Sequence, residues 1–253
     1  MKKVIYTCIV GGYDELRQPI AVDPSFDYIC FSNDYDQERI GVWRIRPIPV
    51  GSGDVTRISR FVKMMPHKAL KDYDVSVWID ANITIVGKGF YDAVDSKVAS
   101  GCLVAQVPHM TRDCVYEELA KCYMDLRIGL YDALRQRRHL IAEGFPRHFG
   151  LFENNLIFRR HNDPFVVGVS ECWWEEYLKY SRRDQLALMP VYWRVGFKPE
   201  FLLGPGENTR NSDSLEIVRH AKVPLGSDLT GPRRLPIKIK WTWRRLVANL
   251  FLR

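Results

Sequence analysis

The stretch from Asp74 to Ile85, DVSVWIDANITI, constrains the fold of this chain more than any other segment. Its apolar and β-branched run is typical of a strand that is buried on both faces of a sheet. Asp80 stands at the end of that run, and Ala81 and Asn82 follow it. A carboxylate in such a strand destabilises the fold by several kcal/mol unless it is paired or bound to a cation. The run therefore predicts a central strand whose end carries a chemical function.

Strand-like and helix-like segments alternate along most of the chain. We expect strands at KVIYTCIVG, FDYICFSND, VWRIRPIP, DVSVWIDANITI, SGCLVAQV and FGLFENNLIFRR, and helices at VTRISRFVKMMPHKAL, RDCVYEELAKCYM, PFVVGVSECWWEEYLKY and RRDQLALMPVYWR. This alternation predicts an α/β fold with a mixed central sheet flanked by helices. Ligands of such sheets bind at the carboxyl ends of the strands. We therefore expect Gly11, Gly12, Asp34, Asp80 and Asn82 to share one crevice.

The strand end at Asp80 is a candidate metal site. Asp80 and Asn82 are two residues apart, so both side chains can face one ion. Divalent ions that carry phosphates are commonly held by one or two carboxylates. His220, which follows the strand-like LEIVR, is a candidate third ligand, although none of the six histidines has an H-E-x-x-H spacing. The alternative is that Asp80 caps a turn and Asn82 holds a tight bend.

The predicted helix that precedes this strand is basic. Asp54 is placed to cap its amino end. Arg57, Arg60 and Lys63 recur every third residue, a spacing that puts them on one helix face. Such a face can bind a diphosphate through charge-assisted hydrogen bonds. The alternative is a solvated face of ordinary surface charges.

Polar residues interrupt two later segments. Glu153, Asn154 and Asn155 lie inside an apolar strand, where polar groups either bind a ligand or close a bulge. Asp184 and Gln185 begin a predicted helix. An Asp at that position is often only a partner of the helix dipole. Both segments are candidates for contacts with a substrate.

The composition places the charge of the protein in one region. The chain has 253 residues and a net charge of +7, yet Arg233–Arg253 contains seven Lys/Arg and no acidic residue. The remainder is therefore neutral, which argues against a nucleic-acid groove. We expect one domain over 1–232 and a basic tail over 233–253. The six cysteines form no C-x-x-C pair, and neither a leader nor a spanning segment is recognisable, so we expect a cytoplasmic protein.

The basic tail also has an amphipathic pattern. Trp243, Leu246, Val247, Leu250 and Phe251 recur at helical spacing among its basic residues. A helix of this kind can lie in the headgroup region of an anionic membrane. It can equally dock on its own domain or on a second subunit, and nucleic acid is a third alternative. The membrane alternative predicts a peripheral position at the inner face of the plasma membrane.

Six motifs in order are similar to those of one known family. They are YTCIVGGYDEL, YICFSND, RISRFVKMMPHKAL, VWIDANITI, GLFENNLIFRRHND and RRDQLAL, and they cover roughly Val4 to Arg194. They resemble the glycosyltransferase-like domain of bacterial polysaccharide clusters and of plant Golgi proteins linked to pectin and mucilage. This resemblance implies a GT-A-like fold that binds a nucleotide-diphosphate sugar. Asp80-Ala81-Asn82 matches its D-x-D motif, with an amide replacing the last acid.

The resemblance implies a function and roles for individual residues. It implies a glycosyltransferase that uses Mn²⁺ or Mg²⁺ and moves a sugar, in the hexosyltransferase manner, to a glycan or lipid-linked glycan of a capsule or lipopolysaccharide. The Asp-Gln pair is similar to that of retaining enzymes, and a late His completes their metal site. The implied catalytic residues are Asp184, Glu153 and Asn154; the implied nucleotide and diphosphate ligands are Thr7, Gly11, Gly12, Tyr13, Asp34, Arg57, Arg60 and Lys63; the implied metal ligands are Asp80, Asn82 and His220.

Two other classes of function remain as alternatives. A non-catalytic protein that binds sugar nucleotides is compatible with the amide at Asn82. A lipid hydrolase of the ceramide type is the other, because a plant relative has been linked to that reaction. The zinc spacing or activated nucleophile that hydrolysis uses is not recognisable in the sequence.

Overall fold

The computed structural model of the chain describes residues 1–50, 54–180, 183–218 and 234–252. These residues form two compact units. The sheet unit comprises Met1–Met110, Phe152–Trp174 and, of the described residues that follow, 198–218. The helical unit comprises Thr111–Leu151, Glu175–Phe197 and the last helix. Every described strand belongs to the sheet unit.

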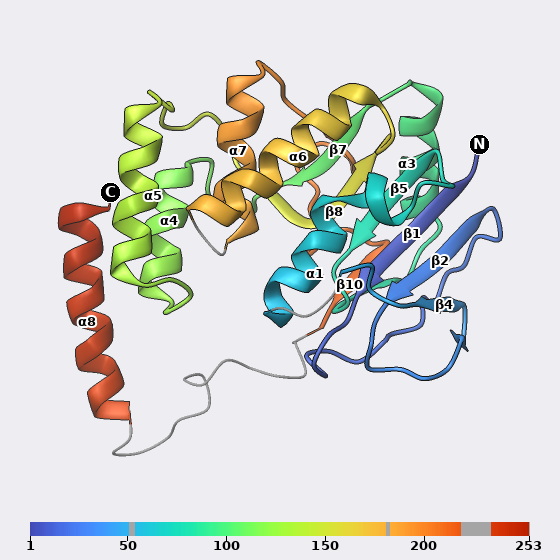
Figure 1. Cartoon of the computed structure of the whole chain (residues 1–253), viewed down its shortest axis with the longest axis horizontal. Helices are drawn as coiled ribbons and strands as arrows, with labels where there is room; N and C mark the ends of the chain where they lie inside the picture. The colour runs from blue at the N-terminus through green and yellow to red at the C-terminus, as the bar shows by residue number, and fades with distance from the viewer. Residues whose placement is uncertain (51–53, 181–182, 219–233, 253) are drawn as a thin grey trace. The chain divides into compact units, whose positions relative to one another are not determined.

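The helices and strands follow the predicted alternation (Figure 1). The strands are β1 Lys3–Cys8, β2 Phe26–Phe31, β3 Arg39–Ile40, β4 Trp43–Arg46, β5 Val75–Ile79, β6 Ile83–Ile85, β7 Val104–Pro108, β8 Phe152–Arg159, β9 Glu200–Phe201 and β10 Leu215–Ile217. The helices are α1 Val55–Met64, α2 Pro66–Ala69, α3 Gly89–Ala99, α4 Val115–Met124, α5 Leu130–Ala142, α6 Pro164–Lys179, α7 Asp184–Arg194 and α8 Arg234–Phe251.

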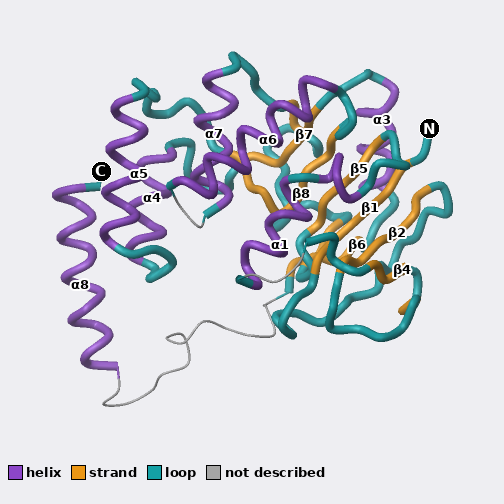
Figure 2. The backbone as a smooth tube through the Cα atoms, in the orientation of Figure 1, coloured by secondary structure: helices purple, strands orange, loops and turns teal. Residues whose placement is uncertain are grey.

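The described strands of the sheet unit form one large sheet and one small one (Figure 2). The large sheet has eight strands in the order β3-β4-β2-β1-β5-β8-β7-β9, and β10 pairs with β6 separately. Strands β4, β2, β1 and β5 are parallel, whereas β8 is antiparallel to both of its neighbours, β5 and β7. The predicted mixed central sheet flanked by helices is confirmed. Because β8 runs backwards, its amino end meets the carboxyl end of β5.

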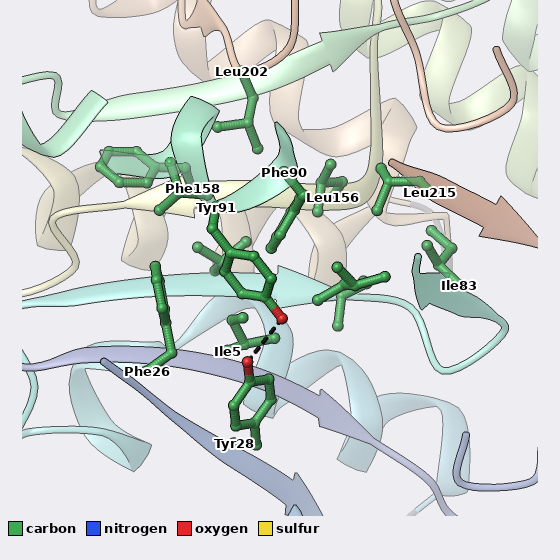
Figure 3. Close-up of a cluster of buried hydrophobic side chains, with 14 of the residues drawn as sticks. Ile5, Phe26, Tyr28, Ile83, Phe90, Tyr91, Leu156, Phe158, Leu202 and Leu215 are labelled. Carbon is green, nitrogen blue, oxygen red and sulfur yellow. Dashed lines mark hydrogen bonds between the residues drawn. The ribbon is translucent and has the colours of Figure 1, made fainter. Parts of the chain in front are cut away.

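One face of the sheet is apolar. Val75, Val77 and Ile79 of β5 pack there with residues of β1, β2, β8 and α3. Figure 3 shows this cluster and its one drawn hydrogen bond, in which the hydroxyl groups of Tyr28 and Tyr91 lie 2.8 Å apart. Polar tips that are buried in an apolar cluster are stable when they find a partner. This face supplies the main hydrophobic core of the sheet unit.

The opposite face is buried but polar. Tyr6 and Trp78 pack edge to face there, with ring centroids 5.2 Å apart. The Tyr6 hydroxyl donates to the backbone carbonyl of Lys63 at 3.2 Å. Nη2 of Arg159 donates to the same carbonyl and to the Tyr6 hydroxyl, both at 2.6 Å. Hydrogen bonds therefore link Arg159 and Tyr6 to the end of α1 on this side of β5, where Tyr6 also packs on Trp78.

Helix α1 begins where the sequence predicts. Asp54 is its N-cap and accepts a hydrogen bond from the Thr56 N–H at 2.9 Å. This bond satisfies one of the backbone donors that a helix leaves unpaired at its start. The helix ends at Met64, and its C-terminal turn is the part that is buried against the sheet. The residues on that turn therefore lie close to the polar face of β5.

The helical unit contains one helix that the sequence analysis did not predict. Helix α5 carries four Arg and His residues between Arg135 and His139, which obscures its short apolar stripe. Only Ala133, Gln136 and Leu140 of this helix are buried. Helix α8 packs on α4, where Nε of Arg244 donates to the Tyr123 carbonyl at 2.7 Å. In the described part of the chain, no helix is both long enough and apolar enough to cross a membrane.

Candidate functional site

The carboxyl ends of β1, β2 and β5 meet at one edge of the sheet, as predicted. Gly11 and Gly12 follow β1 with φ angles of 67° and 57°, a conformation that glycine adopts without strain. The Gly12 N–H donates to Oδ2 of Asp34 at 2.8 Å, which joins the loops that follow β1 and β2. The Asp34 N–H donates in turn to Oγ of Ser32 at 3.0 Å. The structure thus brings together three of the predicted nucleotide-binding residues.

Two further side chains at the end of β1 differ in what they offer a ligand. Thr7 is buried, and its hydroxyl has no hydrogen-bond partner among the described residues. An unpaired buried hydroxyl destabilises a fold by roughly 1–3 kcal/mol, so water or a ligand is expected to satisfy it. Burial raises the pKa of the neighbouring Cys8 thiol far above its usual range. That thiol therefore stays neutral and does not act as a nucleophile. Tyr13, a third residue of the predicted loop, is exposed.

Asp80 follows β5 at this edge, with 28% of its side chain exposed. Its Oδ1 accepts a hydrogen bond from the Trp78 indole N–H at 2.7 Å. The same oxygen accepts from Nζ of Lys63 at 3.3 Å. In the described part of the chain, Oδ2 has no hydrogen-bond partner, so it is the oxygen that a ligand can reach. A carboxylate at this position was expected to be paired or bound to a cation, and in the structure the Lys63 ammonium is its partner.

The predicted basic face of α1 is only partly exposed. Arg57 is exposed, Arg60 is partly buried, and the Lys63 side chain is 2% exposed. Arg60 lies close enough to Cys8 to oppose the rise of that thiol's pKa. Lys63 lies 5.2 Å from the Trp78 ring centroid and faces the sheet. Lys63 therefore does not lie on an exposed face with Arg57, because the last turn of α1 is buried against the sheet.

Asn82 is hydrogen-bonded to Val218, the residue that directly follows β10. Its Nδ2 donates to the Val218 carbonyl at 3.0 Å, and the Val218 N–H donates to the Asn82 carbonyl at 2.9 Å. Oδ1 of Asn82 has no hydrogen-bond partner within the described ranges. His220, the third predicted metal ligand, lies outside the described residues.

The two oxygens that remain open fit a divalent ion only in part. Oδ2 of Asp80 and Oδ1 of Asn82 are of the oxygen type that Mg²⁺ and Mn²⁺ prefer. Among residues 1–50, 54–180, 183–218 and 234–252, however, no group of three His, Cys, Asp or Glu side chains could hold a metal. The site therefore offers one carboxylate and one amide oxygen, and it needs ligands from the substrate to complete a coordination sphere.

The polar residues of β8 form a bulge beside Asp80. Val107 pairs with Glu153 but the adjacent Gln106 pairs with Ile157, so the register shifts at this point. The Asn155 carbonyl accepts from the Asp80 N–H at 2.9 Å. Nδ2 of Asn154 and Oδ1 of Asn155 are buried without a hydrogen-bond partner among the described residues. The bulge interpretation is confirmed, and it leaves two amide groups next to the strand end.

Glu153 is already engaged by other side chains. Nη1 of Arg210 donates to its Oε2 at 2.7 Å, and Nδ2 of Asn155 donates to the same oxygen at 2.8 Å. Nδ2 of Asn155 also donates to the Thr209 hydroxyl at 2.9 Å. Thr209 and Arg210 were not predicted from the sequence, because GENTR has no pattern that marks a site.

Asp184 belongs to the helical unit. It is buried and is the first residue of α7, in the first turn where a carboxylate complements the helix dipole. The same unit has a pocket of about 280 Å³ lined by Arg112, Glu117, Lys121, Met124 and Arg147. Its three cations make it suited to an anion, and no motif in the sequence indicated it.

A family model identifies the class of protein. Residues 1–211 match the model described as TOD1/MUCI70, glycosyltransferase-like domain. The protein is thus a glycosyltransferase-like domain. The chain belongs to the TOD1/MUCI70 family, which confirms the resemblance seen in the motifs.

Several solved glycosyltransferase structures are similar to this chain at low identity. The WbbM bifunctional glycosyltransferase has 10% identity and a TM-score of 0.41 over 80% of this chain, which spans 38% of that protein. Mouse xyloside xylosyltransferase 1 has 10% identity and a TM-score of 0.39 over 77% of this chain and 81% of its own. Galactosyltransferase LgtC, solved with donor and acceptor sugar analogs, has 9% identity and a TM-score of 0.43 over 75% and 69%. No curated protein matches the sequence.

Proposed function

We propose that this protein is a metal-dependent glycosyltransferase that moves a sugar from a nucleotide-diphosphate donor to a glycan acceptor. The observation that carries the proposal is the half-open carboxylate of Asp80, which lies at the edge of the sheet where Gly12 and Asp34 meet. This edge is where α/β sheets bind ligands. The membership of a glycosyltransferase-like family supports the same reaction class.

Different residues at this edge bind the nucleoside, the diphosphate and the metal ion of the donor complex. The Thr7 hydroxyl and the loop at Gly11, Gly12 and Tyr13, with Asp34, bind the nucleoside. Arg57 and Arg60 stabilise the negative charge that develops on the diphosphate. Oδ2 of Asp80, Oδ1 of Asn82 and the His220 imidazole would hold Mn²⁺ or Mg²⁺. Such an ion, when bound, supplies neutralisation of the leaving group.

In the sheet unit, the sugar end of the reaction is assigned to Asn154 and Asn155. Glu153 is held by Arg210, so we assign it to positioning and not to proton transfer. The unpaired amide atoms of Asn154 and Asn155 are suited to sugar hydroxyls. Asp184 acts as base or as stabiliser of positive charge at the sugar, and retention of configuration follows from the similarity of its Asp-Gln pair to that of retaining enzymes.

We assign the pathway to surface polysaccharide, capsule or lipopolysaccharide, at the cytoplasmic face of a membrane. Helix α8 supports this because it has two apolar sides. Val247, Ala248 and Leu252 are buried, whereas Trp243, Leu246 and Leu250 are exposed at helical spacing. Seven basic residues in the tail favour an anionic surface for that exposed stripe. A membrane-bound, lipid-linked acceptor would then be close to the enzyme.

A donor panel tests the reaction. Release of free nucleotide from UDP-, GDP-, CDP- and dTDP-sugars should require Mn²⁺ or Mg²⁺, a lipopolysaccharide or capsule acceptor should increase it, and excess chelator should stop it. Asp184→Asn should lower turnover by orders of magnitude while the donor affinity stays the same. Binding of a donor without any turnover would instead support the non-catalytic alternative. Cleavage of a ceramide with no nucleotide release would support the hydrolase.

Vesicle binding tests the membrane assignment. The exposed triple variant Trp243→Ser, Leu246→Ser, Leu250→Ser should lose co-sedimentation with anionic vesicles at low salt. The variant Leu126→Ser removes an exposed apolar side chain elsewhere in the helical unit, and it should bind vesicles like the unmodified protein. If the unmodified protein ignores anionic vesicles at low salt, where screening is weakest, the assignment is wrong.

A further inference from the structure

Lys63 and Asp80 form an ion pair in which the Lys63 side chain is buried and the Asp80 side chain is partly exposed. The Lys63 side chain is 2% exposed and that of Asp80 is 28% exposed. Lys63 Nζ and the Trp78 indole N–H both reach Oδ1 of Asp80, at 3.3 and 2.7 Å. Both hydrogen bonds therefore fix the carboxylate through Oδ1. Oδ2 accepts no hydrogen bond from the described residues.

The position of Lys63 is itself fixed. Its backbone carbonyl accepts from Nη2 of Arg159 at 2.6 Å and from the Tyr6 hydroxyl at 3.2 Å. Its ammonium lies 5.2 Å from the Trp78 ring centroid, within the range of a cation–π contact. An ammonium that is buried in this way cannot swing out to follow a phosphate, and it remains beside Asp80.

The charge balance of the site follows from this pair. Asp80 carries one negative charge, Lys63 carries one positive charge, and Asn82 is neutral. A site with two carboxylates attracts a divalent ion by its own charge, whereas this pair has a net charge of zero. A free divalent ion gains less at such a site than at a lone carboxylate, because the ammonium repels the ion that the carboxylate attracts.

We propose that Lys63 is the resident counter-cation of Asp80, so that the site takes a divalent ion together with a nucleoside diphosphate and hardly binds the free ion. This inference rests on the proposed function. The diphosphate supplies the negative charge that the protein lacks, and it supplies oxygen ligands as well. Binding of the ion and of the nucleotide is then strongly coupled, and each raises the affinity for the other by the same factor. Lys63 is thereby a positioning residue for Asp80 and not a ligand of the diphosphate.

The test measures Mn²⁺ binding to the full chain by electron paramagnetic resonance, without nucleotide and then with UDP, GDP or ADP. Lys63→Met removes the positive charge at nearly constant side-chain length. We expect it to bind free Mn²⁺ at least about tenfold tighter than the unmodified protein, since one charge facing a divalent ion is worth that much even in water. The gain in Mn²⁺ affinity that the nucleotide brings should shrink by the same factor.

Matched variants separate the charge from other effects. Lys63→Arg keeps the charge and should bind free Mn²⁺ as weakly as the unmodified protein does. Lys68→Met removes an exposed charge from the next helix, α2, and should change nothing. Lys63→Gln keeps a hydrogen-bond donor for Asp80, and it replaces Lys63→Met in the comparison if that variant fails to fold. A merely structural role for Lys63 predicts weaker Mn²⁺ binding in its neutral variants.

The outcomes distinguish this inference from the proposed function. If neutral variants at Lys63 bind free Mn²⁺ no better than the unmodified protein, while Asp80→Asn abolishes binding of the Mn²⁺–nucleotide complex, Lys63 does not act as a counter-cation but the metal site stands. If Asp80→Asn binds that complex as well as the unmodified protein, the metal site at Asp80 is wrong and the inference fails with it.

Discussion

The two faces of β5 differ in what they contribute to the protein. Val75, Val77 and Ile79 point into the apolar cluster, where the described polar tips are paired tyrosine hydroxyls. Ser76 and Trp78 point to the other side, toward Tyr6, Lys63 and Arg159, and Asp80 continues that row beyond the strand. Because successive side chains of a strand point to opposite faces, β5 lines an apolar environment on one side and a polar environment on the other.

The difference lies in how completely the buried polar groups are satisfied. On the polar face, the hydroxyl of Ser76 and two nitrogen atoms of the Arg159 guanidinium are buried without a hydrogen-bond partner among the described residues. Polar groups in such a state destabilise the fold unless water or a ligand reaches them. The apolar face stabilises the fold. The polar face orients Asp80, and its unsatisfied polar groups lower the free energy of unfolding.

The largest effect is expected at the end of the polar row. Asp80→Ala should lower transfer by at least about a hundredfold, the usual loss for a group that stabilises charge in the transition state. The melting temperature should also fall, because the substitution leaves the buried Lys63 ammonium without its partner, so turnover is compared at a temperature where the variant is folded. Nucleotide release with the best donor, measured alongside the melting temperature, gives both readouts. Normal turnover would show that the polar face does not carry the chemistry.

A substitution in the apolar cluster should lower stability without changing the affinity for the donor. Leu156→Ala, on β8, removes a fully buried side chain and should lower the free energy of unfolding by about 2–5 kcal/mol. The folded variant should keep its donor affinity, which isothermal titration can follow below the melting temperature. A loss of donor affinity at full folding would mean that the two faces are not independent.

A buried histidine just beyond β8 should also make the protein sensitive to acid. Burial lowers the pKa of His161 to about 4, with smaller contributions from Arg159 and His67 in the same direction, and its Nε2 lies 2.9 Å from the Leu70 carbonyl. The unfolded chain binds a proton at about pH 6.5, so between these values the unfolded state holds more protons and stability falls as the pH drops. The loss at pH 4 should be about 3 kcal/mol at most. Urea unfolding at pH 7, 5.5 and 4 measures it, and His161→Gln should flatten the profile.

The smallest effect is expected from the paired tyrosines. Tyr28→Phe removes one hydroxyl from the apolar cluster and should lower the free energy of unfolding by about 0.5–1.5 kcal/mol. The Tyr91 hydroxyl still donates to the Ala21 carbonyl at 2.7 Å, so it keeps a partner. Chemical denaturation resolves a change of this size. A loss several times larger would show that the pair organises the cluster instead of merely being tolerated in it.

The sequence predicted the sheet and its edge well because both depend on local patterns. The hydrophobic run before Asp80, the Gly-Gly turn and the Asp54 cap are short-range signals, and each lies where it was expected. The antiparallel direction of β8 depends instead on long-range pairing. No pattern within FENNLIFR indicates which neighbours it takes or in which direction it runs.

The contacts of the site were less predictable for the same reason. Lys63 has the same spacing in the sequence as Arg57 and Arg60, and only the packing of α1 on β5 decides that it is buried. The pairing of Glu153 with Arg210 joins residues far apart in the chain. Spacing along a helix identified candidate charges, but the depth of each charge was set by tertiary contacts.

The position of Trp78 gives the site a built-in optical signal. Its indole N–H is bonded to Asp80 and its ring lies beside the Lys63 ammonium, so any change of charge at the carboxylate alters the electric field across the ring. Tryptophan emission responds to such fields through shifts in wavelength and intensity. Six other tryptophans also emit, but subtracting the response of Trp78→Phe from that of the unmodified protein isolates this ring. Occupancy of the strand end can therefore be followed without a label and before the donor sugar is known.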